Sequence, residues 1–181
     1  MKKLVIGSIV GGILIFIWQT LSWTVLDLHR PGQEYTPKQD SILSYLNSQF
    51  SEDGSYMLPN YQKGISSDEM QKEMKEHQGK PWVQIQYHKA MNTNMGANIG
   101  RGLITDIILV AFLCWILMKI PAPGFGTIFT ACIFIGVIVF TNSPYTVHIW
   151  YPKADISAHL IDALLSWALC GVWLGWWLNR K

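Results

Sequence analysis

Carboxylate and imidazole side chains suited to chemistry lie inside or beside the apolar segments of this chain. Asp155, His159 and Asp162 open the last apolar segment at spacings of four and three residues, which places them on one helix face. Asp106 lies about one helical turn into an earlier apolar segment. Ionisable groups in such segments usually face a bundle interior or a water-filled cavity, and carboxylates with imidazoles bind metals or carry protons. The sequence therefore predicts a metal- or proton-handling site at Asp106, His159 and Asp162.

Three further ionisable residues flank the same segments, namely Asp27, His29 and His148. Charges at the membrane interface cost less free energy than charges deep in a membrane. Asp155 and Ser157 are also suited to cap the last helix. The alternative interpretation is therefore a structural hydrogen-bond network that joins the first, second and fourth apolar segments.

A second candidate site is rich in thioethers. Met70, Met74 and His77 are spaced to share one face of a helix. Methionine and histidine suit Cu(I), so these residues are a candidate copper site. The alternative is that Met70 and Met74 belong to the apolar stripe of an amphipathic helix, which is the commoner use of such spacing.

Motifs of soluble enzymes are missing from the sequence. It contains no nucleophile elbow, no P-loop, no H-E-x-x-H pair and no dinucleotide-binding fingerprint. The sequence therefore favours a role without enzymatic activity and identifies no cofactor.

Four apolar segments must position these residues. The chain has 181 residues, of which 50% are hydrophobic and 14% charged, well below the about 25% charge of soluble domains. A bilayer core is crossed by about 20 apolar residues in a helix. The apolar segments are about Leu4–Leu26, Leu103–Ile120, Phe125–Thr141 and Ile156–Leu178. We expect a membrane-embedded all-α four-helix bundle.

The positive charges predict the topology. The segments expected on one side of the membrane contain only positive charges, on Lys2, Lys3, Lys119, Arg180 and Lys181. Lys and Arg mark the cytoplasmic side. Both termini are therefore expected in the cytoplasm, residues 1–26 as an uncleaved signal anchor, residues 27–101 as an extracytoplasmic domain and residues 102–181 as the remaining three spans.

The segment 27–101 is predicted to be a small α+β domain. Helical spacing follows Thr36, and a second helix starts near Ser66 and ends at Gly79. Short strands are expected at Ser55–Leu58 and Pro81–His88. The domain is nearly neutral, which argues against a nucleic-acid partner, and it is small enough to need the membrane surface or another protein for support.

Small residues of the first span indicate close helix packing. Gly7 and Gly11 are four residues apart, a spacing that lets helices approach closely. This pattern fits packing within the bundle, and it also allows a homo-oligomer. Cys114, Cys132 and Cys170 all fall within predicted spans and are expected to be small core residues.

Several short patterns resemble a family of uncharacterised bacterial four-span membrane proteins. They are Trp18-x-x-Leu21-Ser22-Trp23 with Val25-Leu26 and His29, Tyr56-Met57-Leu58-Pro59, Asn142-x-Pro144-Tyr145, Trp150-Tyr151 and Asp162. The region Met70–His88 departs from the pattern. The resemblance implies a multi-pass protein of the bacterial inner membrane and implies no activity.

These observations lead to three functional expectations. The first is a non-enzymatic accessory or assembly subunit of a larger bacterial inner-membrane complex, in contact with lipid and other subunits. The second is a metal- or proton-handling protein that uses the Asp/His cluster at the outer end of the bundle. The third is a copper-binding protein that uses Met70, Met74 and His77.

Overall fold

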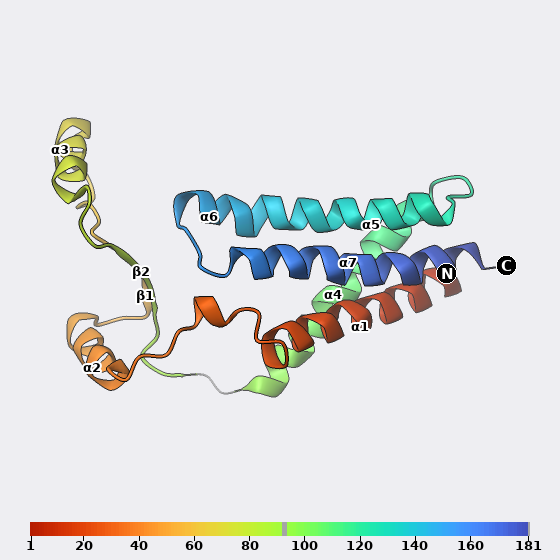
Figure 1. Cartoon of the computed structure of the whole chain (residues 1–181), viewed down its shortest axis with the longest axis horizontal. Coiled ribbons are helices and arrows are strands. Elements are labelled where there is room, and N and C mark those ends of the chain that lie inside the picture. The colour runs from red at the N-terminus through yellow and green to blue at the C-terminus, as the bar shows by residue number, and fades with distance from the viewer. Residues whose placement is uncertain (92–93, 181) are drawn as a thin grey trace. The chain divides into compact units, whose positions relative to one another are not determined.

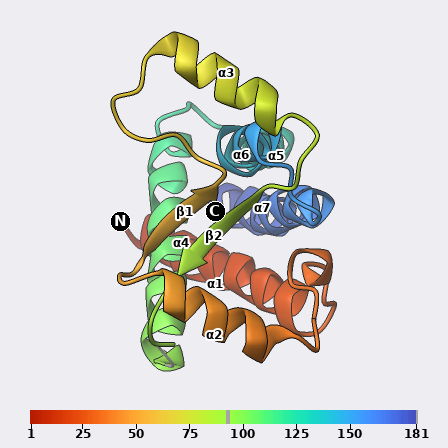
Figure 2. The same cartoon turned by 90° about the vertical axis from the view of Figure 1, so that its left-hand side faces the viewer.

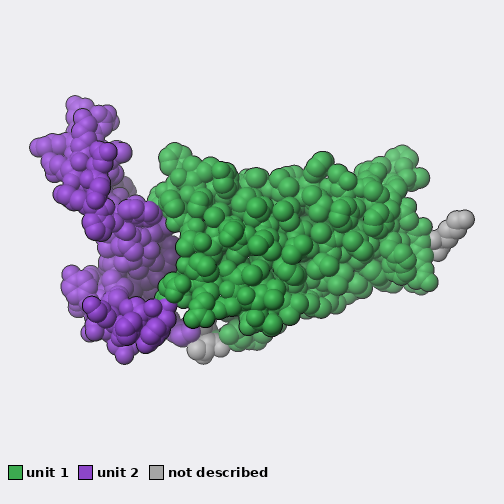
Figure 3. Space-filling view, in the orientation of Figure 1, with its two compact units in different colours: residues 1–34, 94–181 green, residues 35–93 purple. Residues whose placement is uncertain are grey.

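Four long apolar helices pack together and form the larger of two compact units (Figures 1 and 3). The computed structural model describes residues 1–91 and 94–180, so Lys181 of the predicted cytoplasmic charge cluster lies outside the described residues. The long helices are α1 (Lys2–Thr24), α4 (Met95–Leu117), α5 (Phe125–Phe140) and α7 (Ile156–Asn179). All four are long and apolar enough to span a membrane, α5 together with its continuation to Trp150. The predicted fold class, a four-helix membrane bundle with a small α+β insert, is confirmed.

Helix α4 begins earlier than the apolar pattern indicated. The predicted apolar segment begins at Leu103, whereas the helix starts at Met95. The side chain of Asn94 accepts a hydrogen bond of 3.1 Å from the backbone N–H of Ala97. This N-cap satisfies one of the free donors at the helix start, which allows helix to form in a polar, glycine-rich stretch.

The third span continues through a wide turn. A π-helical turn, η2 (Thr141–Tyr145), and a short helix, α6 (Thr146–Trp150), follow α5 where a loop was expected. Pro144 lies within the turn and lacks a backbone N–H, so it fits a wider turn better than a regular helix. The Thr146 hydroxyl donates to the carbonyl oxygen of Thr141 at 2.7 Å and closes this turn.

The bundle core combines small side chains with aliphatic residues and Trp167. Cys114, Cys132 and Cys170 are buried in it, as predicted. Gly7 and Gly11 are also buried, and a Cβ atom at Gly11 would lie 2.8 Å from Val110 of α4 and 3.1 Å from the sulfur of Cys170 of α7. These glycines therefore allow α1 to pack between α4 and α7 of its own chain.

The long helices pack in pairs and are not all parallel. Helix α1 packs against both α4 and α7, and α7 packs against α5. Helix α4 is strongly inclined to α5 and α7 (Figures 1 and 2). These contacts give the order α4–α1–α7–α5, with α4 and α5 as the outer members.

The second compact unit, residues 35–93, is the insert between α1 and α4. Its elements are α2 (Gln39–Gln49), β1 (Gly54–Leu58), α3 (Ser67–His77) and β2 (Val83–Tyr87). The strands pair antiparallel, with Gly54 opposite Tyr87 and Leu58 opposite Val83. The two helices lie at opposite ends of this hairpin (Figure 2). The first helix begins at Gln39 rather than near Thr36, and it has no side-chain cap.

The insert has a very small core. The ring of Phe50 stacks on that of Tyr56 with centroids 3.9 Å apart, and the Tyr87 hydroxyl donates to Asn47 at 2.8 Å. Tyr87 alone is buried among the described residues of this unit. Such a unit gains little stability from burial of its own side chains.

Candidate metal centre at the start of α7

His29 occupies the centre of a polar network between α1 and α7. The chain reverses after α1 through Asp27, whose φ angle is 50°, and enters a short 3₁₀ turn, η1 (Arg30–Gly32). A Cβ atom on Gly32 would lie 2.9 Å from the carboxyl group of Asp155, so glycine permits the close approach of this turn to α7. The imidazole of His29 is thereby only 2% exposed.

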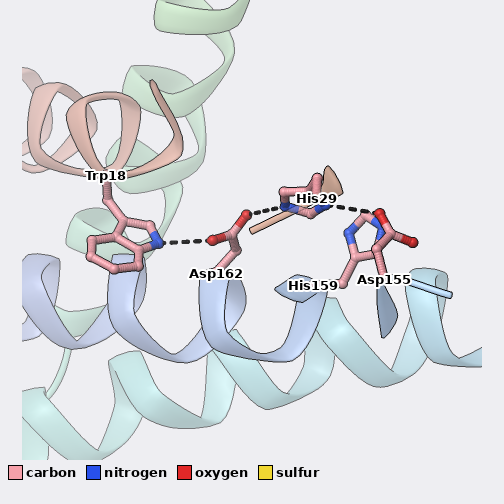
Figure 4. Close-up of polar contacts among 5 residues, drawn as sticks. All are labelled: Trp18, His29, Asp155, His159 and Asp162. Atoms are coloured by element: carbon pink, nitrogen blue, oxygen red, sulfur yellow. Dashed lines mark hydrogen bonds and ion pairs between the residues drawn. The ribbon is translucent and has the colours of Figure 1, made fainter. Parts of the chain in front are cut away.

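Both ring nitrogens of His29 face carboxylates of the α7 segment (Figure 4). Nδ1 lies 2.9 Å from Oδ2 of Asp155, and Nε2 lies 2.8 Å from Oδ2 of Asp162. Two hydrogen bonds to carboxylates need a proton on each ring nitrogen, or a proton held by one carboxyl group. Buried carboxylates require a partner of this kind because an unpaired buried charge is strongly unfavourable.

Asp162 is also held from α1. The indole Nε1–H of Trp18 donates to its Oδ1 atom at 3.0 Å. Since Oδ2 accepts from or donates to His29, both oxygens of Asp162 have partners. Helix α1 thus fixes the orientation of Asp162, and Asp162 in turn fixes the ring of His29.

His159 completes a group of potential metal ligands. Its Nε2 atom lies 3.4 Å from Oδ2 of Asp155, and its ring meets that of His29 edge-on at 4.7 Å. One ligand atom from each of His29, Asp155 and His159 can be chosen so that all lie within 4.8 Å of one another. Two imidazoles and one carboxylate are a known ligand set for Zn²⁺ and for Fe²⁺, and they leave a coordination position open.

The residues around this group supply two further properties of metal sites. A ligating histidine usually passes its other N–H to a carboxylate, which is the relation of His29 to Asp162. Burial alone would raise the pKa of Asp155, but the hydrogen bond from His29 and the charge of nearby His159 outweigh it, so the pKa is lowered. Asp155 therefore remains an ionised carboxylate, the form that binds metals.

A surface hollow gives access to these ligands. Its volume is about 470 Å³, and Gly32, Lys153, Asp155 and His159 are among the residues that line it. A polar opening of this size admits a hydrated ion to Asp155 and His159.

The structure separates the three residues of the predicted Asp/His site. His159 and Asp162 belong to the network, whereas Asp106 does not take part in its contacts. Asp106 is buried in α4, where its side chain interacts with Gln19, and within the described residues its Oδ2 atom has no hydrogen-bond partner. The residues that contact His159 and Asp162 in the network are His29 and Asp155 rather than Asp106.

The other flanking residues have partners of their own. Asp27 pairs with Arg30 at 3.2 Å on the surface, and His148 Nδ1 accepts from the backbone N–H of Lys153 at 2.9 Å. The sequence had singled out His29 together with these residues. The chain reversal after α1 distinguishes His29 from Asp27 and His148, and the spacing of residues in the sequence does not reveal this reversal.

The thioether-rich candidate lies on α3 of the insert. Met70 and Met74 are 40% and 57% exposed, so they are not core residues of the unit. Met74 and His77 line one surface hollow together with Met57, and Met70 is not among the residues that line it. The copper site at Met70, Met74 and His77 stays a prediction.

No family model, curated protein sequence or solved structure matches this chain. The resemblance to four-span bacterial proteins therefore identifies no family. The fold itself defines the class: a multi-pass membrane protein with four helical spans, an α+β insert after the first span, and an Asp/His network where α1 ends and α7 begins.

Proposed function

We propose that this protein binds a divalent first-row transition metal ion, such as Zn²⁺, through His29, Asp155 and His159. The observation that carries the proposal is the mutual approach of their ligand atoms within 4.8 Å. The bracing of His29 by Asp162, and of Asp162 by Trp18, supports it because metal ligands are usually oriented in this way. From the charge distribution we further propose that the site faces the extracytoplasmic side.

The proposal is tested by metal titration of the full-length, tag-free protein in detergent. After treatment with a chelator, the protein is titrated with Zn²⁺ and separately with Fe²⁺ under anaerobic conditions, and bound metal is measured by mass spectrometry. We expect one ion per chain. His29→Gln and His159→Gln should weaken binding by more than the about 10–100-fold that changes around metal ligands cost.

His88→Gln is the matched control because His88 lies in the insert, where it pairs with Asp53, and belongs to neither candidate metal site. It should bind the metal like the unchanged protein. Equal binding by all three variants, or no binding by the unchanged protein, would contradict the proposal and leave the network with a structural role. A lower unfolding temperature of the His29 variant would then identify that role.

A second candidate function, an accessory subunit of a larger membrane complex, is favoured by the surface of the insert. Large apolar side chains there remain in contact with solvent, including Leu43 at 59%, Tyr45 at 65% and Trp82 at 48% exposure. Because the core of this unit is so small, contact of these side chains with the membrane or another subunit would add to its stability. Purification at native expression level in a mild detergent tests this function, since stoichiometric recovery of other membrane proteins is expected and recovery of the chain alone would contradict it.

A further inference from the structure

A cavity within the membrane-spanning part of the bundle lies next to the Asp/His network. Its volume is about 530 Å³, and it is lined by residues of α1, α4, the end of the third span and α7. Helix α4 is inclined to α5 (Figures 1 and 2), and residues of both helices line the cavity. The volume is in the range of small-molecule sites in proteins.

The cavity has an apolar wall and a polar floor. Ile99 of α4 and Val139 of the third span line it, are 49% and 44% exposed, and belong to helices apolar enough to span a membrane. Gln19, His159 and Ser166 supply polar groups. Gln19 interacts with Asp106 and His159 with Asp155, but each side chain has further hydrogen-bonding positions that a lipid chain alone would not satisfy. The cavity therefore suits a molecule with a polar head and an apolar chain.

The charges of the lining residues restrict the head of that molecule. None of the described residues that line the cavity is lysine or arginine, so an anionic head would find no cation other than a protonated His159. The carboxylate of Asp162 faces the same space, but both of its oxygens are engaged by Trp18 and His29. It repels anions and offers no free oxygen to a cationic head. An uncharged head with hydroxyl or carbonyl oxygens fits best.

We propose that this cavity binds an uncharged amphiphile from the bilayer, with its oxygen-bearing head against Gln19, His159 and Ser166 and its chain in the lipid. Lipid alcohols and quinones share this chemistry. Binding does not require the metal, although His159 takes part in both sites.

The test is native mass spectrometry of the full chain in detergent, titrated with dioleoylglycerol, with decylubiquinone and with oleate as an anionic probe. At least one uncharged probe should bind in a ratio of one per chain, and oleate should not. Preference for dioleoylglycerol or for decylubiquinone distinguishes the two sources. The proposal is overturned if neither uncharged probe binds better than oleate.

Two pairs of variants locate the binding. Val139→Trp and Ile99→Trp fill the cavity and should weaken binding of the uncharged probe at least about tenfold, the effect of about 1.4 kcal/mol. Ile138→Trp and Ile104→Trp lie on the same helices, are exposed and do not line the cavity, and should bind normally. Equal binding by filled and control variants would overturn the proposal. Zinc titration of the same variants shows whether each is folded and separates this result from the metal proposal.

Discussion

The imidazole of His29 lies flat on the indole of Trp23, with ring centroids 3.8 Å apart and planes inclined by 4°. His159 meets the same imidazole edge-on at 4.7 Å. The ring is thus held by aromatic contacts in addition to its bonds to Asp155 and Asp162.

Replacement of Trp23 tests the contribution of this contact to stability. Trp23→Leu should lower the free energy of unfolding by about 1 kcal/mol, because it removes the stacked ring, while Trp23→Phe should retain part of it. Thermal unfolding in detergent measures the difference. Equal unfolding temperatures for the Leu and Phe variants would show that the aromatic face is not what stabilises His29.

Replacement of Asp162 and of Asp106 distinguishes the proposed metal site from the ligand set predicted from the sequence. Asp162→Asn should weaken zinc binding about 10–100-fold, because it removes the carboxylate that orients His29. Asp106→Asn is the matched control, since Asp106 lies outside the network contacts, and should leave the affinity unchanged. A comparable loss in the Asp106 variant would favour a site that includes Asp106 instead.

The packing of α5 on α7 depends on Gly136. A Cβ atom there would lie 2.5 Å from the carbonyl oxygen of Ala163, so Gly136→Ala must push the helices apart. We expect a loss of about 1–3 kcal/mol in the free energy of unfolding. Gly126→Ala on the same helix meets nothing within 4 Å and should be nearly neutral. Similar unfolding temperatures for the two variants would contradict this description of the interface.

The start of α3 should depend on pH. Ser66 and Glu69 form a capping box, and the hydrogen bonds from the Ser66 side chain and backbone hold the pKa of Glu69 below its ordinary value of 4.5. A lowered carboxyl pKa stabilises the folded form fully above that ordinary value, and the stabilisation is lost as the pH falls through the lowered pKa.

Hydrogen exchange of the α3 amides at matched pH checks this dependence. Glu69→Ala should reduce amide protection at neutral pH, and its difference from the unchanged protein should vanish in acid. Glu76→Ala, later in the same helix, should change protection little at either pH. A Glu69 effect that persists unchanged in acid would rule out the charged hydrogen bond as its cause.

The elements were predictable where a local pattern specifies them. Unbroken apolar runs identified the four spans, and alternation from Val83 to Tyr87 identified β2. The start of α4 was misplaced because its first residues are polar and its N-cap, Asn94, precedes the apolar run. The continuation of α5 past Thr141 was missed because the apolar run ends there, and a π-helical turn that contains Pro144 continues the helix.

The candidate site was predictable only in part. The spacing of Asp155, His159 and Asp162 on one helix is local information. The partner of these residues, His29, lies 126 positions from Asp155 in the sequence, and it reaches α7 only through the reversal at Asp27. Asp106 was predicted as a site residue because it lies inside a span. Depth in a span indicates how costly a charge is, but it does not identify the residues that lie beside it.

The position of His29 along the chain has a mechanical consequence. Unit 2 begins at Tyr35, a few residues beyond the point where His29 is bonded to Asp155 and Asp162. A force applied to the insert through this connection would load those bonds before it reached α1. In a single-molecule experiment that pulls at Tyr35, the attachment of His29 to α7 should therefore rupture before α1 unfolds.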